Sequence, residues 1–497
     1  MTLPRIALQP ASQYSQLNAA SHGLIILPAG AVLPTDLPQK AQWLAVLKRK
    51  KMKPKELSKT PLALDLPDGR RLALLMADTR LSRFERLTRL RKAIMLLLDE
   101  TPGRLSIWVA AGEGMSDVAR DAAYVAQVNG VPLPVRKKKP AVALTGIELC
   151  SSLTAADLAP VVALARANLL ARELTAMAPN ELTPSTYRKR IRSVAKQAGL
   201  AIEEFDFRAL RKMGAGAFCA VAQGSHHEDA AIVHLSWRPR LKDAAASKTV
   251  ALVGKGICFD TGGHNLKPAR YMAGMHEDMN GSAVALALTL AAAEMKLPVA
   301  IDCWLAIAHN HLSPGAYKQN DIVTALDGTT IEIVHTDAEG RMVLADTLLM
   351  ATGALGKGKA KAKPDLVVDF ATLTGSMHVA LGARYSGVFA SSEQLGSLAV
   401  AAGQGSGERV CVFPLDEDYD PALDSKVADV KQCTLDGEAD HILAARFLQR
   451  FTGKRPWLHV DLSASSCSGG LGATATDLTG FGVAWGVTLL AQWLAQE

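Results

Sequence analysis

The chain has few cysteines, and they are not arranged as zinc ligands. No Cys-x-x-Cys pair occurs among the seven, which stand at positions 150, 219, 258, 303, 411, 433 and 467 of 497 residues. Most lie in apolar runs, as Cys219 does in AFCAV and Cys303 in IDCWLA. Scattered cysteines of this kind are typical of reduced core thiols. We therefore expect a cytoplasmic protein without a thiolate zinc site.

Long apolar runs are also scarce. The first residues, MTLPRIALQPASQY, lack a basic stretch followed by a long apolar one, so we expect no secretory signal. The long uncharged run at 478–496 contains glycine and polar residues. It barely reaches the ~18 to 20 apolar residues that a membrane span requires. We predict a buried terminal helix there and no membrane partner.

Aromatic residues make up only 5% of the chain, and none is interleaved with the lysines of its basic segments. The formal charge of +7 is concentrated in three lysine-rich stretches, 47–59, 135–140 and 356–364. Each could contact phosphates, but lysine runs without interleaved aromatic residues are more typical of solvated loops. We expect no nucleic-acid partner.

Short apolar runs alternate with amphipathic stretches, which predicts an α/β fold. An example is the predicted strand at 71–78 followed by the predicted helix at 82–100. A long helical pattern at 154–177 runs into the breaker cluster APNELTP and marks a domain joint. We predict a smaller N-terminal α/β domain, 1–165, and a larger domain, 166–497, with a mixed central sheet flanked by helices.

The segment VHTDAEGRMVLADTLL, at 334–349, places Asp337, Glu339 and Arg341 at alternate positions. Alternate side chains of an extended segment point the same way, so these three would face one space. The alternative is a solvated turn before a helix, because acidic residues favour the first helical turn.

A second segment, 250–283, offers partners for these side chains. A predicted strand ends at Gly254, Lys255 follows it, and Asp260 lies in a Gly-rich turn. Ligands of open α/β sheets bind beyond the carboxyl ends of strands, so both segments should reach one rim. With Asp278 and Lys267 the rim holds four carboxylates and two lysines. Crowded carboxylates require cations, and one or two divalent metals such as Mg²⁺, Mn²⁺ or Zn²⁺ would supply them.

At these residues the chain resembles the leucyl (cytosol) aminopeptidases, a family of dinuclear metallopeptidases. The resemblance rests on VGKGICFDTGG, LKP, EDM and TDAEGRMVLAD, supported by APNELTP, AVAQGS, FATLTG and VAD. It covers the chain from about residue 170. It implies a metal-dependent aminopeptidase that removes Leu-like, apolar N-terminal residues from peptides.

The resemblance also implies the metal ligands. Lys255, Asp260, Asp278 and Glu339 would hold the tighter of two ions, Mn²⁺ or Zn²⁺. Asp260, Asp337 and Glu339 would hold the more exchangeable ion. A lysine ligates only as a neutral amine, and burial beside a dication would lower its pKa enough to allow this.

Two cationic side chains would act in catalysis. Lys267, which the resemblance does not make a ligand, would stabilise the oxyanion formed when water attacks the peptide carbonyl. Arg341 lies at a helix start, where anions bind readily, and its planar fork suits an oxyanion. The resemblance implies that this anion is bicarbonate, acting as the general base.

Substrate contacts and assembly are further implications of the resemblance. A free α-amino group would bind one metal and contact Asp278. Met275, Thr372 and Gly375 would line the side-chain pocket, and Leu373 would contact the substrate backbone. The family also implies a homohexamer.

Several positions depart from the family pattern, namely His264, Asn265, His276, Asn280 and His335. None removes a predicted ligand. His335 would hydrogen-bond its loop or titrate near neutrality. The pairs His226/His227 and His309/His311 are interpreted as loop or hydrogen-bonding histidines rather than zinc ligands.

Two other functions stay open at this point. One is a binding protein that keeps the fold but has a DNA-binding or regulatory role through its basic N-terminal surface. The other is two-metal phosphoryl chemistry, although the chain lacks a GxxxxGK[ST] loop.

Overall fold

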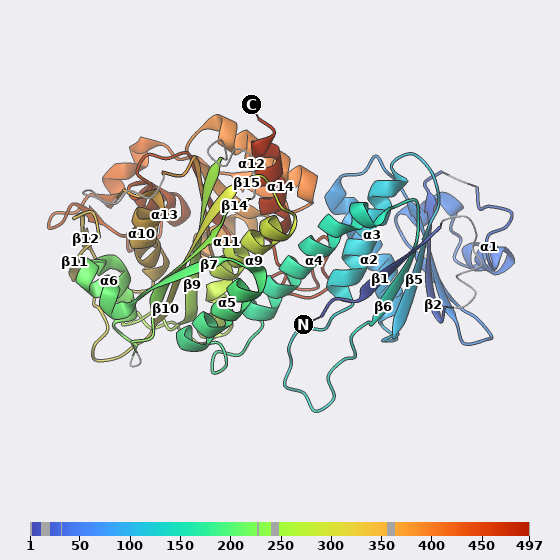
Figure 1. Cartoon of the computed structure of the whole chain (residues 1–497), viewed down its shortest axis with the longest axis horizontal. Helices are drawn as coiled ribbons and strands as arrows, with labels where there is room; N and C mark the ends of the chain where they lie inside the picture. Colours follow the sequence, from blue (N-terminus) through green and yellow to red (C-terminus); the bar gives the residue numbers. More distant parts are fainter. Residues whose placement is uncertain are drawn as a thin grey trace. The chain divides into compact units, whose positions relative to one another are not determined.

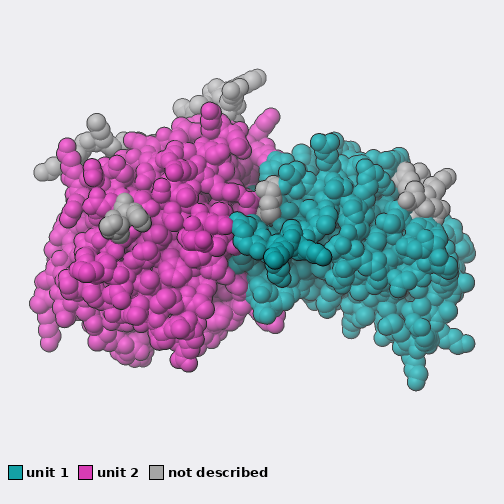
Figure 2. All heavy atoms as spheres, turned by 90° about the horizontal axis from the view of Figure 1, so that it is seen from below, with its two compact units in different colours: residues 1–169, 404–407, 467–479 teal, residues 170–403, 408–466, 480–497 magenta. Residues whose placement is uncertain are grey.

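The computed structural model describes residues 2–10, 20–30, 32–225, 228–239, 248–354 and 363–496. His226, His227 and most of the lysine-rich stretch at 356–364 lie outside these residues. The chain forms two compact units (Figure 2). Unit 1 is Met1–Leu169, Gln404–Gly407 and Cys467–Thr479, and unit 2 is Leu170–Gly403, Glu408–Ser466 and Gly480–Glu497. The division into domains 1–165 and 166–497 stays a prediction.

Unit 1 is built on a six-stranded sheet in the order β1-β6-β5-β2-β4-β3. Strand β3 is antiparallel to β4, and the other neighbours are parallel. Alternate residues of β2 enter two different cores, since Leu24 and Ile26 pack with α2 and α3 while Ile25 packs with Trp43 of α1. The sheet is therefore covered on both faces. Its elements are β1 (Arg5–Gln9), β2 (His22–Pro28), α1 (Lys40–Arg49), η2 (Pro54–Ser58), β3 (Leu62–Asp65), β4 (Arg71–Ala77), α2 (Arg83–Leu98), β5 (Arg104–Val109), α3 (Met115–Asn129) and β6 (Gly146–Cys150).

Local sequence explains where several helices begin and end. Ser82 precedes α2 and accepts the backbone N–H of Glu85, whose side chain reaches back to Ser82. This reciprocal capping box satisfies two donors that a helix start leaves unpaired. Helix α5 (Pro184–Ala198) begins after the capping residue Thr183 and ends at Gly199, which adopts the left-handed conformation with φ 69°. Helix α4 (Ala155–Thr175) runs through the chain position at which unit 1 gives way to unit 2.

Unit 2 contains an eight-stranded sheet, β15-β14-β17-β13-β9-β10-β8-β7, and a three-stranded sheet, β11-β12-β16. Strands β17, β13, β9 and β10 are mutually parallel, whereas β14, β8 and β7 form antiparallel pairs. The predicted α/β fold with a mixed central sheet flanked by helices is therefore confirmed. The strands are β7 (Ala201–Asp206), β8 (Ala231–Trp237), β9 (Thr249–Asp260), β10 (Ala300–Asn310), β11 (Ile322–Thr324), β12 (Thr330–Glu332), β13 (Leu366–Ala371), β14 (Ser386–Ala390), β15 (Val410–Val412), β16 (Val430–Lys431) and β17 (Trp457–Asp461).

Helices cover both faces of the large sheet. Val253 of β9 belongs to the core around α10, whereas a Cβ added to the next residue, Gly254, would lie 2.5 Å from Ser282 Cα in α9. Because successive strand residues point to opposite faces, α9 and α10 lie on opposite sides of β9 (Figure 1). The remaining helices are α6 (Phe207–Met213), α7 (Gly216–Ala222), α8 (Ala269–Met272), η4 (Met275–Met279), α9 (Asn280–Glu294), α10 (Glu339–Thr352), α11 (Gly375–Leu381), α12 (Glu393–Ser406), η5 (Glu417–Leu423), α13 (Asp440–Gln449) and α14 (Val483–Leu494).

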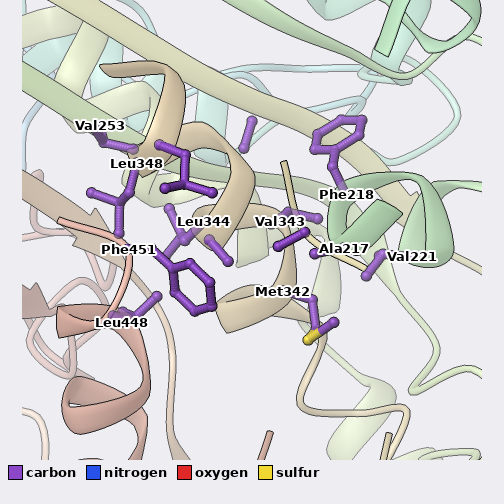
Figure 3. Packing of buried hydrophobic residues seen from close by; sticks show 14 of the residues in the cluster. Ala217, Phe218, Val221, Val253, Met342, Val343, Leu344, Leu348, Leu448 and Phe451 are labelled. Atoms are coloured by element: carbon purple, nitrogen blue, oxygen red, sulfur yellow. The ribbon is translucent and has the colours of Figure 1, made fainter. Parts of the chain in front are cut away.

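Helix α10 is the central helix of unit 2, and all 14 of its residues are buried. Its apolar side chains belong to one core cluster with residues of α7, β9 and α13 (Figure 3). The labelled members are Ala217, Phe218, Val221, Val253, Met342, Val343, Leu344, Leu348, Leu448 and Phe451. Full burial of one such large side chain contributes about 1.5–3 kcal/mol. The packing therefore fixes the first turn of α10, which carries Glu339 and Arg341.

The uncharged C-terminal run forms helix α14, in which Trp485, Leu489 and Leu490 are buried. This agrees with the predicted buried helix. Within the described ranges, no helix is both long enough and apolar enough to cross a membrane.

Candidate metal centre

The predicted ligands come from four separate places in unit 2. The predicted end of the strand at Gly254 is wrong, because β9 continues to Asp260. Lys255 therefore lies inside β9, and Asp260 is the last residue of that strand rather than part of a turn. Asp278 lies in η4, just before α9, and Glu339 is the first residue of α10. Asp337 lies in the turn before α10. The carboxyl end of β9 is thus where these side chains gather.

Lys255 connects two of the carboxylates, Asp278 and Glu339. Its Nζ lies 2.8 Å from Asp278 Oδ1 and 2.8 Å from Glu339 Oε1, and it donates to the carbonyl oxygen of Thr372 at 2.9 Å. The side chain is only 3% exposed. With these three acceptors every N–H of the ammonium group has a partner, since an ammonium group has three N–H donors.

Lys267 connects the other two carboxylates, Asp260 and Asp337. Its Nζ lies 3.0 Å from Asp260 Oδ2 and 2.5 Å from Asp337 Oδ1. Carboxylate oxygens of Asp260, Asp337 and Glu339 lie within 4.8 Å of one another, close enough to share a metal ion. The structure therefore brings together all four carboxylates and both lysines that the sequence singles out.

Burial and the neighbouring carboxyl groups raise the pKa of Asp278, Asp337 and Glu339. Burial, with Glu339 and Asp260 nearby, raises the pKa of Asp278 to about 8, although Lys255 opposes this. Burial and the charges of Asp260 and Glu339 raise the pKa of Asp337 to about 7. The pKa of Glu339 is raised as well, first by burial and then by Asp260. Further cations would therefore be taken up in exchange for protons.

The pKa values of the two lysines are also raised, but here the cause is the neighbouring carboxylates and burial opposes the change. Burial alone would lower the pKa of Lys255, but the charges of Asp278 and Glu339 outweigh burial and raise it. The pKa of Lys267 is raised in the same way, mainly by Asp260 and Glu339. Both are ammonium ions in the ion-free cluster, so Lys255 must lose a proton before its nitrogen can bind a metal.

The donor set fits divalent metals. Asp278 Oδ2 is buried and has no hydrogen-bond partner among the residues that the structure describes. A buried carboxylate oxygen left in this way is costly unless a cation meets it. Oxygen-rich sites completed by nitrogen suit Mn²⁺ or Zn²⁺.

Glycine at two positions allows the cluster to be this compact. Gly262 has φ +86°, and a Cβ there would lie 3.0 Å from Asp337 Oδ1. A Cβ at Gly340 would lie 2.7 Å from Lys255 Cε and 2.8 Å from Leu373 Cδ1. Any larger residue at position 340 would therefore displace Lys255 or Leu373.

The expectation that Asp337, Glu339 and Arg341 alternate along an extended segment is wrong. Strand β12 (Thr330–Glu332) ends before this segment, and the chain then turns before α10 begins at Glu339. Residues two apart in a helix do not share a face. Asp337 and Glu339 still converge, but Arg341 points elsewhere. Its Nη1 donates to Gln432 O at 2.8 Å, and its Nη2 donates to Asp440 Oδ1 at 2.7 Å.

Two of the four predicted substrate positions, Thr372 and Leu373, lie beside the cluster. Thr372 Oγ1 donates to Asp278 Oδ1 at 2.7 Å, and the side chain of Leu373 reaches the first turn of α10 at Gly340. Met275 is half-buried at the start of η4. Gly375 is exposed, and a Cβ added there would meet nothing within 4 Å. Space is thus open beside Gly375.

Sequence reasoning missed several side chains that hold the ligand loops. Asn310 Nδ2 donates to Asp260 Oδ1 at 2.8 Å and to the carbonyl oxygen of Thr336 at 3.1 Å. The Tyr317 hydroxyl donates to the same carbonyl at 2.7 Å. Asp461, the last residue of β17, accepts from Leu373 N at 3.0 Å. The sequence could have indicated Asn310 and Asp461, because each is a polar residue at the end of an apolar strand.

The departures from the family pattern have local explanations in most cases. Asn265 Oδ1 accepts from Thr336 N, and its own N–H donates to Thr336 Oγ1, both at 2.8 Å. Asn280 donates to Thr175 Oγ1 at 2.9 Å. His335 Nδ1 accepts the N–H of Asp337 at 3.3 Å, which favours the loop hydrogen bond for this residue. Burial lowers the pKa of both His335 and His276.

The histidine pair at 309 and 311 forms a stacked contact rather than a separate metal site. The two ring centroids are 4.2 Å apart with an interplanar angle of 12°. His264 is exposed. Among the described residues, the group of acidic or histidine side chains close enough to hold an ion is Asp260, Asp337 and Glu339.

The fold is α/β with a mixed sheet, and lysines and carboxylates gather at the carboxyl end of its central strand β9. These features define a class of α/β proteins with a site for divalent metals. Comparison with known proteins narrows this class. Residues 169–487 match the model described as the cytosol aminopeptidase family, catalytic domain. The chain belongs to this family, as the sequence motifs predict.

Curated relatives and solved structures agree with this assignment. A probable cytosol aminopeptidase of Afipia carboxidovorans is 41% identical over 331 residues, which is 66% of this chain and 63% of the relative. One from Rhodopseudomonas palustris is 38% identical over 330 residues, with the same two shares. The chain thus matches less than two thirds of the length of these relatives.

Two solved structures extend the likeness to nearly the whole chain. The bottromycin maturation enzyme BotP in complex with Mn is 30% identical with a TM-score of 0.83, covering 96% of this chain and all of that one. The leucyl aminopeptidase of Leishmania major in complex with actinonin has 24% identity and a TM-score of 0.82, covering 99% and 95%. The second likeness supports the fold alone. None of these names refers to nucleic acid, so the DNA-binding alternative gains no support.

Proposed function

We propose that this chain is a metal-dependent aminopeptidase, a hydrolase that removes apolar, Leu-like residues from the N-termini of peptides. The proposal rests on the cluster of two lysines and four carboxylates at the candidate metal centre. Lys255 lies between Asp278 and Glu339, and Lys267 lies between Asp260 and Asp337, in a member of the cytosol aminopeptidase family. A protein that served only as a scaffold would not need to hold four carboxylates together.

Two divalent ions would bind here. Lys255, Asp260, Asp278 and Glu339 would hold the first, and Asp260, Asp337 and Glu339 would hold the second. When bound, such ions polarise a carbonyl group and lower the pKa of water, which is the chemistry that peptide hydrolysis needs. Manganese is supported by the neighbouring structure named as a complex with Mn, and zinc remains the alternative.

The remaining side chains have separate tasks. Lys267 is cationic because Asp260 and Glu339 raise its pKa, and its ammonium group would stabilise the oxyanion of the attacked peptide carbonyl. Asp278 would receive the α-amino group of the substrate. Its Oδ2, for which the described part of the chain offers no hydrogen-bond partner, supports this task. Only an N-terminal residue has such an amino group, so the enzyme would be an exopeptidase.

Preference for the N-terminal side chain would come from Met275, Thr372 and Gly375, while Leu373 would contact the substrate backbone. The half-buried Met275 and the open space at Gly375 support an apolar pocket with room for a side chain. One methylene group in such a pocket changes discrimination by only about 1–3 kcal/mol. Graded rates for Leu, Met and Ala substrates are therefore expected.

Cytoplasmic location and assembly into a homohexamer remain predictions. The name of the curated relatives, cytosol aminopeptidase, supports the location. Sedimentation velocity tests the assembly, for which we expect six chains per particle. The bicarbonate on Arg341 also remains a prediction, and it is supported by the buried Nε of Arg341, which has no hydrogen-bond partner among the described residues.

Hydrolysis of leucine p-nitroanilide tests the proposed function. Metal-stripped protein should be inactive, and Mn²⁺ or Zn²⁺ should restore turnover. Lys267→Ala should bind metal but lose about 100-fold or more in kcat, the usual effect of removing one oxyanion donor. Glu339→Ala should lose metal binding and activity together. Inactivity of the metal-loaded native protein on a panel of N-terminal residues would contradict the proposal.

A further inference from the structure

Asp461 is a buried carboxylate that is not among the proposed metal ligands. It is the last residue of β17, and it is only 2% exposed. Its Oδ1 accepts from Leu373 N at 3.0 Å, and its Oδ2 accepts from Thr374 Oγ1 at 2.7 Å. Both oxygens of this carboxylate are therefore bound to one short segment of the chain, 372–374.

The segment 372–374 lies just beyond the ladder of the large sheet. Strand β13 ends at Ala371, which is paired with Asp461 of β17, and α11 begins at Gly375. A backbone N–H beyond the end of a strand needs another acceptor when it is withdrawn from water. For Leu373 that acceptor is the Asp461 side chain. Asp461 thus continues the fixation of the chain past the end of β13.

The same segment also contacts the candidate metal centre. The carbonyl oxygen of Thr372 accepts from Lys255 Nζ at 2.9 Å, and Thr372 Oγ1 donates to Asp278 Oδ1 at 2.7 Å. The side chain of Leu373 reaches Gly340 in the first turn of α10. The segment therefore has two anchors, one formed by Lys255 and Asp278 and the other formed by Asp461.

The two anchors differ in their dependence on metal. Lys255 must lose a proton before it can bind a metal, and Asp278 is itself a proposed ligand, so metal binding changes the groups that Thr372 contacts. The two hydrogen bonds of Asp461 involve no proposed ligand. The anchor at Asp461 can therefore hold the segment in one position both with and without metal.

A neighbouring ion pair supports the buried carboxylate of Asp461. His459 precedes it by two residues in β17, and His459 Nδ1 lies 2.5 Å from Asp369 Oδ1 of the paired strand β13. Burial would lower the pKa of His459, but the charge of Asp369 outweighs burial and raises it. Burial raises the pKa of Asp461, and the charge of His459 and the hydrogen bonds from Thr374 and Leu373 oppose this rise.

We infer that Asp461 is a positioning residue of the reaction, which clamps the segment 372–374 so that Leu373 meets the substrate backbone beside the metal centre. This inference rests on the proposed function, in which Leu373 makes that contact. The proposed metal ligands lie in β9, η4, the turn before α10 and α10 itself. Loss of the clamp should therefore disturb the orientation of the substrate and leave the metal ligands in place.

Steady-state kinetics with leucine p-nitroanilide, combined with calorimetric titration of Mn²⁺, test this inference. Asp461→Ala should lower kcat/KM by about 10- to 100-fold, because a displacement of about 1 Å in a positioning group can cost 100-fold. Most of the loss should appear as a higher KM, and the Mn²⁺ affinity should stay close to that of the native protein. Asp461→Asn keeps an oxygen that can accept from Leu373 N, so it should recover most of the loss.

A second readout requires no turnover. In hydrogen-exchange mass spectrometry of the native chain, the Leu373 amide should exchange slowly in the metal-free and in the Mn²⁺-loaded protein, because its acceptor is not a metal ligand. Asp461→Ala should lose this protection.

Asp346→Ala is the matched control. Asp346 is also a buried carboxylate of unit 2, and it accepts from Phe218 N and from Leu326 N, both at 2.8 Å. Its removal should likewise reduce the free energy of unfolding. The variant should nevertheless keep the slow exchange of Leu373 and the native KM, because the hydrogen bonds that it loses lie away from the segment 372–374.

Three results would overturn the inference. The Leu373 amide could exchange rapidly in the native chain, a folded Asp461→Ala could keep the native KM, or its loss of activity could be matched by an equal loss of Mn²⁺ affinity. The first is measured on the native chain, so it does not depend on how well the variants fold. Inactivity of the native protein would instead contradict the proposed function, so the two failures are distinguishable.

Discussion

Gly340 determines how closely Lys255 can approach Glu339 in the candidate metal centre. Gly340 lies between the ligand Glu339 and Arg341 in the first turn of α10. A Cβ at this position would come within 2.9 Å of both Lys255 Cε and Nζ. The absence of a side chain at position 340 is therefore what allows Lys255 to reach Glu339.

Gly340→Ala is expected to displace Lys255 and weaken metal binding by about 10- to 100-fold, as changes beside metal ligands commonly do. Ala is the better helix former by about 1 kcal/mol, so the fold itself should not be lost. Calorimetric titration of metal-stripped protein with Mn²⁺ measures the effect.

Gly396→Ala in α12 provides the control. A Cβ there would lie 3.5 Å from Val412, an ordinary contact, so metal affinity should not change. Equal Mn²⁺ affinities for Gly340→Ala and the native protein would show that Lys255 is not held by this contact.

At the scale of the elements, neighbouring strands share a charged contact at their ends. Asp302 of β10 lies 2.8 Å from His234 Nε2 of β8 and 2.9 Å from Arg238 Nη2. Burial alone would raise the pKa of Asp302, but hydrogen bonds from His234 and Arg238 outweigh burial and lower it. A lowered folded-state pKa means that the contact stabilises the fold above the unfolded pKa of about 3.9.

Asp302→Asn is expected to reduce the free energy of unfolding at pH 7 by about 1 kcal/mol, since Arg238 is partly solvated. The native protein should lose this stabilisation as the pH falls below about 4, whereas the variant should lose less. Urea unfolding between pH 3 and pH 7 measures both.

The exposed pair of Asp78 and Arg80 provides a comparison, because Arg80 is 87% exposed and Asp78→Asn should have little effect. Parallel stability curves for Asp302→Asn and the native protein across this pH range would rule out the contact as a source of acid sensitivity.

The sequence predicted elements well where apolar pattern and strand ends decide the structure. The unbroken apolar run before Lys255 identified the first part of β9, although the strand continues to Asp260. The rule that ligands gather at the carboxyl ends of strands grouped Asp260 with Glu339. The sequence predicted the segment that begins at Val334 poorly, because the turn there is held by Gln432, which lies 98 residues from its partner Val334. Pairings over such distances leave no periodic trace in the chain.

Arg341 illustrates the same limit. The sequence predicted that Arg341 lies at the start of a helix, and its positive charge indicated that it binds an anion. The carboxylate that Arg341 contacts, Asp440, lies 99 residues further on in the acidic stretch DGEAD, which resembles a solvated loop. Only the packing of α13 beside α10 brings the two side chains together.

At the scale of the whole molecule, every predicted metal ligand belongs to unit 2. Metal binding should therefore stabilise that unit directly. Free Mn²⁺ at 100 times its Kd should add about 2.7 kcal/mol per site to the free energy of unfolding. Differential scanning calorimetry of metal-stripped protein, with and without Mn²⁺, should show the transition of unit 2 at a higher temperature.

Asp337→Asn and Glu339→Gln should respond less, because each removes a charged ligand from the set. An unchanged transition on addition of Mn²⁺ to the native protein would show that these carboxylates do not form a metal site. The Lys267→Ala variant should keep the shift, since Lys267 is not among the proposed ligands.

The complete burial of α10 has a consequence for the durability of the candidate metal centre. A helix with no solvent-facing residue can expose its amides only when the surrounding core opens, so its hydrogen exchange should be among the slowest in unit 2. Glu339 and Arg341 belong to that helix. The centre should therefore keep its shape until the unit unfolds as a whole, and heat should abolish turnover and tertiary structure at the same temperature.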